Sequence, residues 1–399
     1  MNKPEPIIHK LIDELTQSNY SFALYRLPWT DEPVFVMQTD GEYPESVNSL
    51  GMLNDKKGFV IIPFNITQEQ PGLIIRPDIN ELGWDNIASA LDNFRKNIPD
   101  TGIVSETSHN TTYNTAHCDD SENVSEPDLK AKYIETFGKF INPLKKKEFR
   151  KLVLSRCAQT EIEENFSCLD AFIAAANNYP RMMISLCHTP VSGTWLGSTP
   201  EIILSGQASN WNTVALAGTM PMQGENMPTE WHKKDKEEQA IVSEYIYKVI
   251  KKFSNKATAK GPYTARAGQL VHLKTDFQFT LKNTSILGDL LDALHPTPAV
   301  CGLPKTEAYN FILENEGYNR KYYSGIIGWL NPDGITNLYV NLRCMNISGN
   351  TATLFAGGGI LPSSEANSEW EETQHKICLL YTSPSPETAA NIVCRLLLE

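Results

Sequence analysis

The segment from His295 to Lys376 reads HPTPA at residues 295–299, EGYNR at 316–320, GGG at 357–359 and EWEETQHK at 369–376. Carboxylates, cations and glycines recur in it beside apolar runs. A hydrophobic core does not accommodate so many charged groups, because burying an unpaired charge is costly. Their spacing instead suits a site that holds a small anion by means of a metal ion. This segment decides how the rest of the chain is interpreted.

The composition is that of an ordinary soluble globular protein. The chain has 399 residues, 41% of them hydrophobic, which corresponds to two or three domains or to one large one. It has 47 acidic and 35 basic residues and a net charge of −12, which argues against a general nucleic-acid-binding surface. The N-terminus lacks the apolar run of a signal peptide, and no stretch reaches the ~18 apolar residues that a membrane span needs. We therefore expect a cytoplasmic protein.

The eight cysteines are scattered among apolar runs, and none forms a C-x-x-C pair. This spacing argues against a zinc site. We expect the cysteines to be reduced and to serve as small core residues.

The apolar pattern divides the chain into three portions. Residues 1–100 alternate short apolar runs with turn residues, which predicts several strands, an amphipathic helix at the N-terminus and a helix near residues 84–94. We expect this αβ portion to pack on the core of the rest. Residues 101–127 are rich in Ser, Thr, Asn and Asp, which predicts a loop or mobile linker. Residues 128–399 form the third portion.

In the third portion, strands alternate with helices. Long strand pairs that look antiparallel, together with covering helices, indicate the α+β class. The predicted strands lie at residues 151–156, 182–187, 194–196, 201–205, 214–217, 270–273, 324–330, 338–343 and 352–355. The predicted helices lie at residues 128–144, 229–253, 306–315, 368–380 and 387–398.

Two residues at strand starts are candidates for proton transfer. Lys151 begins the strand KLVLSR, and the sequence alone favours a solvated end of the preceding basic run. If the lysine instead lies in a cleft beside other cations, desolvation and like charge would lower its pKa from ~10.4 toward neutrality and make it a general base. Glu201 follows a tight turn and precedes an apolar strand. It is either a strand-end charge or a buried acid with a raised pKa that can donate a proton.

Three glutamates on predicted helices are candidate oxygen ligands for Mg²⁺. Glu238 shares a helix face with apolar residues, although a first-turn glutamate favoured by the helix dipole is a common alternative. Glu369, Glu372 and Lys376 are spaced three and four apart and share one face of another helix. Glu372 and Lys376 could equally form an ordinary surface pair. In the functional interpretation, Lys376 meets a substrate carboxylate.

Other residues suit the binding of an anion. Arg343 ends a predicted strand, and a guanidinium is suited to bidentate binding of a carboxylate. Tyr323 lies twenty residues earlier, in KYYSG. Glycines at Gly218 and at residues 357–359 would let backbone amides approach a ligand closely. Each signal alone is weak, and nothing matches a phosphate loop or a dinucleotide fingerprint.

Taken together, these segments resemble the chorismate-utilising enzymes. The resemblance extends from about residue 147 to residue 381, with the motifs in the family's order, whereas the N-terminal third matches no motif. The motifs are KLVLSR, GSTPE, LAGT, KDKEEQ, HPTPAVCGLP, EGYNR with YYSG, and AGGGI followed by EWEETQHK. The resemblance implies one large α+β domain like that of anthranilate synthase component I. In that fold two antiparallel sheets are stacked, helices lie outside, and the active site lies between the sheets.

The resemblance also implies roles for individual residues. Lys151 resembles the base that activates water at ring C2 of chorismate, and Glu201 resembles the acid that protonates the departing C4 hydroxyl. Glu238 and Glu372 correspond to ligands of Mg²⁺, and Glu369 supports the metal site directly or through water. The residues that correspond to substrate-binding positions are Gly218, Thr219, His272, Ala299, Tyr323, Arg343, Gly357, Gly359 and Lys376.

The charge of the substrate agrees with these roles. Chorismate is a dianion, so an acidic protein must supply local positive charge through Mg²⁺, Arg343 and Lys376. The resemblance implies that the metal holds the ring carboxylate and that Tyr323 and Arg343 hold the enolpyruvyl carboxylate. The same positive charge would help to keep Lys151 neutral.

Several positions favour the family members that isomerise chorismate to isochorismate. Ala217 stands where resembling aminodeoxychorismate synthases carry a nucleophilic lysine, and Lys151 stands where anthranilate synthases carry glutamine. Salicylate synthases share Lys151 and Glu201 and are the alternative. They tend to have a bulkier hydroxyl residue at position 299, and HLGS where this chain has HLKT at residues 272–275. The chain departs from common family residues at Gln239, Gly358 and Thr199.

We therefore expect a Mg²⁺-dependent isomerase that adds water at C2 of chorismate and releases the C4 hydroxyl. A lyase that continues to salicylate and pyruvate is the second interpretation, and a catalytically silent chorismate-binding protein is the third. No obvious coiled coil or swapped arm is present, so we expect a monomer without an obligate amidotransferase subunit. Menaquinone and catecholate siderophore synthesis both begin with isochorismate, and the sequence does not distinguish them.

Overall fold

Two large antiparallel sheets form the centre of the structure. The computed structural model describes residues 1–97, 126–163, 166–222, 227–228, 230–267 and 270–381. Within these residues each sheet has nine strands, and neighbouring strands run antiparallel. The predicted α+β class and the pair of antiparallel sheets are therefore confirmed.

The first sheet is centred on a long strand pair. In spatial order its strands are β14 (Gly302–Leu303), β7 (Lys151–Glu161), β18 (Thr351–Ile360), β17 (Cys344–Ser348), β9 (Gly193–Thr199), β8 (Met183–Thr189), β1 (Ser21–Arg26), β2 (Val34–Gln38) and β6 (Ile79–Leu82). In the central pair of β7 and β18, Gly357 lies opposite Ser155 and Gly359 lies opposite Val153. The three consecutive glycines therefore run beside the strand that begins with Lys151.

The second sheet contains the other half of the strands. In spatial order they are β12 (Ala257–Ala267), β13 (Leu270–Thr280), β11 (Asn210–Pro221), β10 (Ile202–Gln207), β16 (Thr336–Val340), β15 (Ile326–Leu330), β4 (Gly58–Ile62), β5 (Gly72–Ile75) and β3 (Glu45–Val47). The register of β11 on β13 shifts after Ala217, so that Thr219 lies opposite His272. Strands from residues 1–97 extend both sheets.

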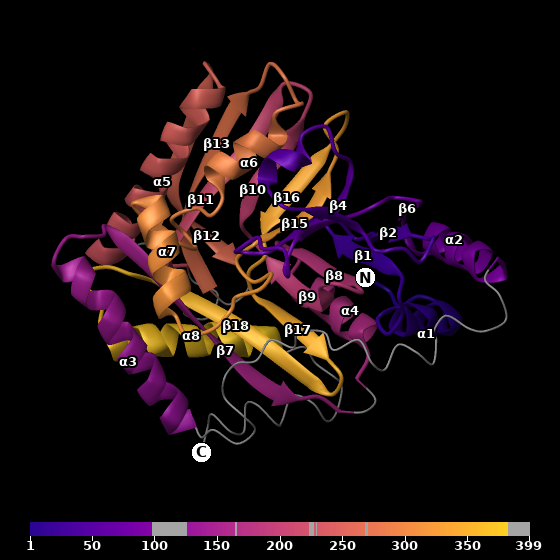
Figure 1. Cartoon of the computed structure of the whole chain (residues 1–399), viewed down its shortest axis with the longest axis horizontal. Coiled ribbons are helices and arrows are strands. Elements are labelled where there is room, and N and C mark those ends of the chain that lie inside the picture. The colour runs from indigo at the N-terminus through magenta and orange to yellow at the C-terminus, as the bar shows by residue number, and fades with distance from the viewer. Residues whose placement is uncertain (98–125, 164–165, 223–226, 229, 268–269, 382–399) are drawn as a thin grey trace.

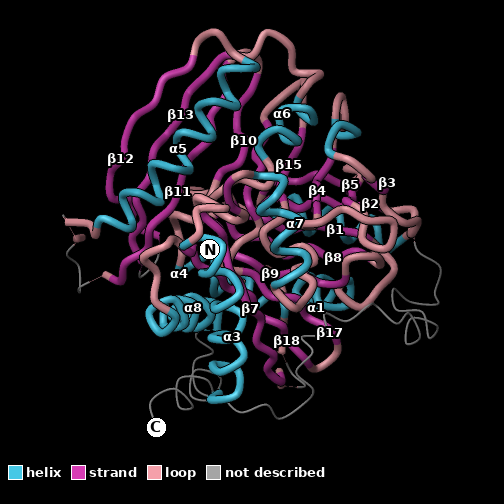
Figure 2. The backbone as a smooth tube through the Cα atoms, turned by 60° about the vertical axis from the view of Figure 1, so that its left-hand side comes forward, coloured by secondary structure: helices cyan, strands magenta, loops and turns pink. Residues whose placement is uncertain are grey.

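Helices cover the outer faces of the two sheets (Figures 1 and 2). Helices α5 and α6 pack against the second sheet, whereas α4 and α8 pack against the first, and α3 lies beside α8. The helices are α1 (Pro6–Leu15), α2 (Trp84–Lys96), α3 (Glu126–Lys145), α4 (Cys168–Asn178), α5 (Lys233–Phe253), α6 (Leu287–Leu294), α7 (Lys305–Asn315) and α8 (Ala366–Tyr381), with a short 3₁₀ helix at Leu50–Leu53. Helices α5 and α8 carry the acidic residues of interest into the interior.

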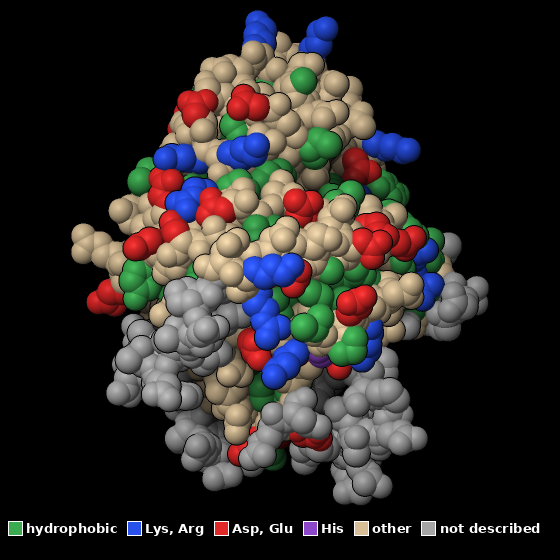
Figure 3. Space-filling model, turned by 90° about the vertical axis from the view of Figure 1, so that its right-hand side faces the viewer, with side chains coloured by type: hydrophobic (Ala, Val, Ile, Leu, Met, Phe, Trp, Pro, Cys, Tyr) green, Lys and Arg blue, Asp and Glu red, His purple; other side chains and the backbone are tan. Residues whose placement is uncertain are grey.

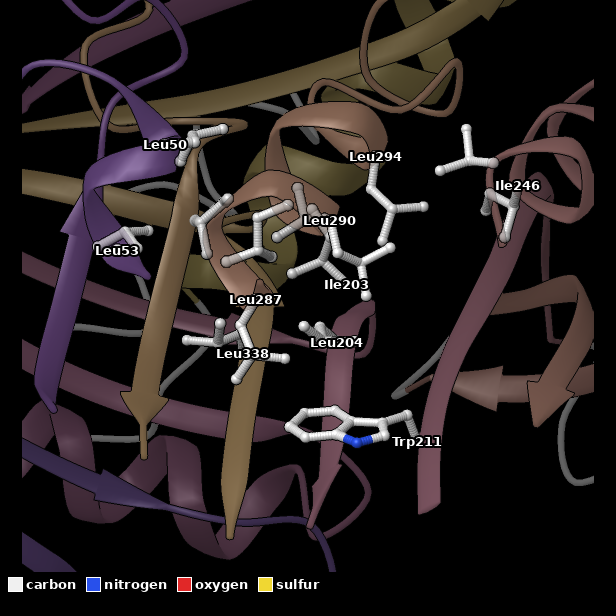
Figure 4. Close-up of a cluster of buried hydrophobic side chains, with 14 of the residues drawn as sticks. Leu50, Leu53, Ile203, Leu204, Trp211, Ile246, Leu287, Leu290, Leu294 and Leu338 are labelled. Atoms are coloured by element: carbon white, nitrogen blue, oxygen red, sulfur yellow. The ribbon is translucent and has the colours of Figure 1, made fainter. Parts of the chain in front are cut away.

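Apolar side chains fill the layers between these elements. The layer between the sheets is rich in aromatic residues, and Trp195 stacks on Phe355 with ring centroids 5.6 Å apart. A second layer lies between the second sheet and helices α5 and α6, and includes Leu204, Trp211 and Leu290 (Figure 4). This packing fixes helix α5 against strand β11, and β11 forms one wall of the cleft described below.

The cysteine prediction is partly wrong. Cys168, Cys187, Cys301 and Cys344 are free and buried, as expected. Cys157 on β7, however, forms a disulfide bond. The prediction rested on the absence of C-x-x-C spacing, and that spacing does not test pairing between cysteines that are distant in sequence.

Two predicted segments lie outside the described residues. They are the helix at 387–398 and almost all of the linker at 101–127. Among the helices that the structure does describe, none is long and apolar enough to cross a membrane. On the face shown in Figure 3, acidic and basic side chains are interspersed, with apolar patches between them.

Candidate active site

A cleft of about 700 Å³, part of it open to solvent, is lined by residues from both sheets and from helices α5 and α8. Strands β7 and β18 contribute from the first sheet, and β11 and β13 from the second. Twelve of the fourteen residues that the sequence singled out line it. They are Glu201, Gly218, Thr219, Glu238, His272, Ala299, Tyr323, Arg343, Gly357, Gly359, Glu372 and Lys376. The other two do not line the cleft but contact residues that do. Lys151 is paired with Glu238, and Glu369 lies beside Gly358.

The glycines of β18 bring the strand into contact with the acids. A Cβ atom on Gly359 would lie 2.0 Å from Oε1 of Glu238. A Cβ atom on Gly358 would lie 3.2 Å from Oε2 of Glu369 and 3.5 Å from Oε1 of Glu372. Carboxylates from two helices therefore converge on one stretch of backbone, and residues without side chains leave the space that they occupy.

Lys151 is fully buried and forms an ion pair with Glu238. Its Nζ lies 2.9 Å from Oε1 of Glu238, although it makes no hydrogen bond of normal geometry within the described part of the chain. Burial acts to raise the pKa of Glu238, but the nearby ammonium groups of Lys151 and Lys234 outweigh it and lower that pKa. The solvated interpretation of Lys151 is therefore wrong, and so is the exposed first-turn interpretation of Glu238. The ammonium group has donors that a bound ligand could use.

The other two acids are also paired with lysines. Lys376 donates to Oε1 of Glu372 at 2.7 Å and to the carbonyl of Gly357 at 2.7 Å. Lys234 forms an ion pair and hydrogen bond with Glu369, which is 1% exposed. The predicted i,i+4 pair of Glu372 and Lys376 thus exists, but it lines the cleft and is only partly exposed.

The acid cluster fits a magnesium ion by its chemistry. Carboxylate oxygens are the ligands that Mg²⁺ prefers. Oε2 of Glu369 is buried and makes no hydrogen bond of normal geometry among the described residues, although Ser364 is near enough to the carboxylate to act on its pKa. This oxygen is therefore an acceptor that a cation could use. Burial, and then the carboxylate of Glu372, raises the pKa of Glu369 to about 7. Within the described ranges, no three His, Cys, Asp or Glu side chains are already arranged as a metal site. The metal ligands therefore stay a prediction.

Glu201 is a buried acid, which was one of the two interpretations of its sequence position. Its side chain is 3% exposed, just before β10, and its backbone N–H donates to Oγ1 of Thr199. Burial raises the pKa of Glu201 to about 8, although the charge of Lys151 acts in the opposite direction. The carboxyl group is therefore mostly protonated near neutral pH and is able to donate a proton. The strand-end interpretation is wrong, because the residue is not solvated.

Arg343 and His272 form a fixed pair in the opposite wall. Arg343 donates through Nη2 to Nε2 of His272 at 2.7 Å, and Nδ1 of His272 donates to the carbonyl of Gly218 at 3.0 Å. Burial, and then the charges of Arg343 and Lys376, lowers the pKa of His272, so the ring is neutral. No carboxylate in the described ranges forms an ion pair with Arg343, and this guanidinium is therefore available to an anion.

Comparison with known proteins places the chain in a family. The family model described as "Chorismate binding enzyme" matches residues 58–383. The chain belongs to this family. The match covers the cleft and begins at β4, inside the N-terminal third for which the sequence motifs gave no resemblance.

Curated relatives of this chorismate-binding enzyme carry consistent names. It is 30% identical over 200 residues to the isochorismate synthase EntC of Escherichia coli K12, covering 48% of this chain and 51% of the relative. It is 32% identical over 191 residues to the salicylate biosynthesis isochorismate synthase of Pseudomonas aeruginosa, covering 46% and 40%. The aligned region thus spans about half the length of the curated relatives it matches.

Solved structures share the fold over nearly the whole length. The menaquinone-specific isochorismate synthase MenF of Escherichia coli superimposes with a TM-score of 0.72 at 20% identity, covering 93% of this chain and 90% of MenF. Anthranilate synthase component I of Streptococcus pneumoniae superimposes with a TM-score of 0.64 at 17% identity, covering 90% and 92%. At these low identities the superpositions establish the fold alone, and it is the fold that the sequence motifs implied.

The two charged residues of the EGYNR motif, Glu316 and Arg320, have a structural role in this chain. Glu316 accepts bonds from Arg320 at 2.5 and 2.6 Å and from Ser155, and it does not line the cleft. Arg320 also donates to the carbonyls of Val153 and Val300, two residues that do line it. The pair therefore supports the cleft from behind, and the part of the opening interpretation that counted these charges as site chemistry is wrong.

Sequence reasoning missed Lys234 and Asp235. Lys234 was not singled out, although it lies four residues before Glu238 on the same helix, and that spacing was the available signal. Asp235 packs against Gly218, where a Cβ atom would lie 3.0 Å from that of Asp235. Burial, and then the charge of Glu238, raises the pKa of Asp235 to about 6. The acid cluster is thus larger than predicted.

Proposed function

We propose that this protein is an isochorismate synthase, which converts chorismate to isochorismate by adding water at ring C2 and releasing the C4 hydroxyl. The observation that carries the proposal is a buried lysine and a buried, largely protonated glutamic acid beside one cleft. Lys151 is close enough to Glu201 for its charge to lower the pKa of that carboxyl group. An anion-binding wall with Arg343 lies in the same cleft.

The chemistry needs one base and one acid. Lys151 removes a proton from water as the oxygen bonds to C2, for which its ammonium group must first release a proton, and Glu201 donates a proton to the departing C4 hydroxyl. Water is consumed and released, so chorismate and isochorismate have the same composition. Lys151 ends the step protonated and Glu201 ionised, and a return of the proton restores both. The contact with Glu238 at 2.9 Å holds the Lys151 side chain in place for this exchange.

Positive charges in the cleft would bind the two carboxylates of chorismate. Glu238, Glu369 and Glu372 would hold Mg²⁺, which when bound contributes positive charge at the ring carboxylate. Arg343 is the cation that suits the enolpyruvyl carboxylate, because His272 orients its guanidinium and no carboxylate in the described ranges neutralises it. Tyr323 stacks on Phe355 with ring centroids 5.3 Å apart, and its hydroxyl oxygen would lie 3.0 Å from a Cβ atom on Gly357.

The wall residues argue against an amine as the nucleophile. Ala217 lines the cleft and is buried, so the position that carries a nucleophilic lysine in aminodeoxychorismate synthases has no amine here. A base such as Lys151 serves water, which must lose a proton as it attacks. We therefore propose chorismate and water as the substrates, with no amidotransferase subunit.

The test is identification of the product by NMR after incubation of the purified protein with chorismate and Mg²⁺. We expect isochorismate as the only new product. Salicylate and pyruvate formed without a partner enzyme would instead identify the lyase, and bound chorismate with no turnover would identify the silent binding protein. The Glu201→Gln variant should keep chorismate binding and lose turnover by roughly 10²–10⁴-fold, because the proton donor is gone.

A further inference from the structure

Lys234 lies in the first turn of α5 and reaches across to α8. Its ammonium group is hydrogen-bonded to Oε1 of Glu369, which is 1% exposed, whereas the Lys234 side chain is 25% exposed. Lys234 thus links the helix that carries Glu238 to the helix that carries Glu369 and Glu372. It belongs to none of the roles assigned above.

The charge of Lys234 acts on the whole acid cluster. Its ammonium group is paired with Glu369, and Lys234 lies four residues before Glu238 on the same helix. Glu238 and Glu372 are also near enough for their charges to act on it. Without a cation near them, three carboxylates in a buried place would repel one another.

The three lysines of the cluster differ in their freedom to leave. Lys151 is fully buried. Lys376 is anchored twice, because it also donates to the carbonyl of Gly357. Within the described chain, Lys234 forms its ion pair with Glu369. Because the Lys234 side chain is partly exposed, its aliphatic part can extend and place the ammonium group in water. Of these three lysines, Lys234 is thus the one whose ammonium group can leave its carboxylate and be solvated by water.

We propose that Lys234 is a tethered cation that neutralises the acid cluster while no divalent ion is bound and competes with that ion for Glu369. The proposal rests on the proposed function, because it takes the three glutamates as the metal ligands. Oε2 of Glu369 makes no hydrogen bond of normal geometry in the described structure, so the first contact with an incoming ion can form there before Oε1 is released by Lys234. Binding of the ion then requires the ammonium group to leave.

The test is metal binding in the absence of chorismate, with removal of the competing charge. Lys234→Met keeps the length of the stem and removes the ammonium group. Lys233→Met is the matched control, because Lys233 precedes it in the same turn, is exposed and loses the same charge. Lys234→Arg restores a cation. Mn²⁺, an ion that prefers the same oxygen ligands, is titrated into each protein, and electron paramagnetic resonance measures the concentration of free Mn²⁺.

We expect Lys234→Met to bind Mn²⁺ about tenfold more tightly than the unmodified protein, because the ion no longer displaces an internal cation. Lys233→Met and Lys234→Arg should stay near the unmodified value. A second measurement follows thermal unfolding with and without Mg²⁺. Lys234→Met should unfold at a lower temperature without Mg²⁺ and should gain more from its addition than either the unmodified protein or Lys233→Met.

Equal or weaker Mn²⁺ binding by Lys234→Met would overturn the proposal, because Lys234 would then be inert or would help to position Glu369 for the metal. If that result came with normal production of isochorismate, the proposed function would stand without this inference. Tighter binding by Lys234→Met together with no turnover of chorismate by the unmodified protein would support the tethered cation and remove the proposed function. An absence of Mn²⁺ binding in every variant would overturn both.

Discussion

The backbone of Gly359 lies so close to Glu238 that a methyl group on this glycine would be 2.0 Å from Oε1 of the carboxylate. The same methyl group would be 2.8 Å from Cε of Lys151. Non-bonded heavy atoms do not approach so closely, so strand β18 and the ion pair can share this space only if residue 359 has no side chain. The last glycine of the GGG sequence is thus a condition for the ion pair.

Gly359→Ala should therefore separate Glu238 from Lys151 or push β18 away from both. We expect isochorismate formation to fall by at least about 100-fold, since displacement by an ångström at a catalytic site is enough for such a loss. Stability should fall by about 1–3 kcal/mol because the site is overpacked. Steady-state kinetics and urea unfolding measure the two effects.

Gly138→Ala is the matched control for that substitution. Gly138 lies inside helix α3, and nothing is within 4 Å of a Cβ atom placed there. Alanine in a helix interior should raise stability by about 0.5–1 kcal/mol and leave activity unchanged. A Gly359→Ala protein that behaved like this control would show that the close contact is relieved at no cost.

Removal of the buried lysine should destabilise the protein through the acid it leaves behind. Lys151→Met strands Glu238, which is buried and ionised in the paired state. We expect a loss of about 3–5 kcal/mol in the free energy of unfolding, because an uncompensated charge remains in the interior. The double variant Lys151→Met with Glu238→Gln should recover most of this loss and remain inactive. Urea unfolding measures the recovery, and a double variant no more stable than Lys151→Met alone would contradict the coupling.

Glu201 should make the stability of the protein decrease as pH rises. Its carboxyl group has a pKa of about 8 when folded, against an ordinary value of 4.5 for a solvated glutamate. Between these values the folded state holds a proton that the unfolded state has lost, so the free energy of unfolding falls across this window and the loss is complete above about pH 8.

The Glu201→Gln variant removes this dependence because its side chain stays neutral. Relative to the unmodified protein it should gain stability from pH 5 to pH 9, by an amount on the order of a few kcal/mol, since each pKa unit is worth about 1.4 kcal/mol. Urea unfolding at both pH values gives the difference, in which the other titrating groups cancel. Parallel pH profiles for the two proteins would mean that residue 201 is not a buried acid with a raised pKa.

The fold class could be predicted because its signals are local in the sequence. The strand expected at residues 151–156 is the first half of β7. The edge strand β12 was missed because most of its side chains are exposed and small or polar, and its conformation depends on pairing with β13. Helix α6 was missed because its eight largely apolar residues are too few for periodicity to separate a helix from a buried strand.

The site could be predicted as a set of residues, but its pairing could not. The motifs named the acids, the lysines and the glycines that the cleft brings together. Which lysine meets which acid depends on how helix α5 packs on β11 and helix α8 packs on β18. Lys234 and Glu369, for example, are 135 residues apart in sequence. The burial that sets the pKa of Glu201 is likewise a property of the packed sheets and not of the residues beside it in the chain.

The ion pair of Glu316 and Arg320 lies outside the cleft lining, so its removal should affect stability far more than catalysis. Glu316→Gln leaves the buried guanidinium without its carboxylate and should cost about 3–5 kcal/mol. The exposed Glu314→Gln change, two residues earlier, removes the same charge and should be nearly neutral. Below the unfolding temperature, the Glu316→Gln protein should keep its KM for chorismate within a few-fold. A loss of turnover without a loss of stability would instead place Glu316 in the chemistry, since only a group that acts on the substrate could have that effect.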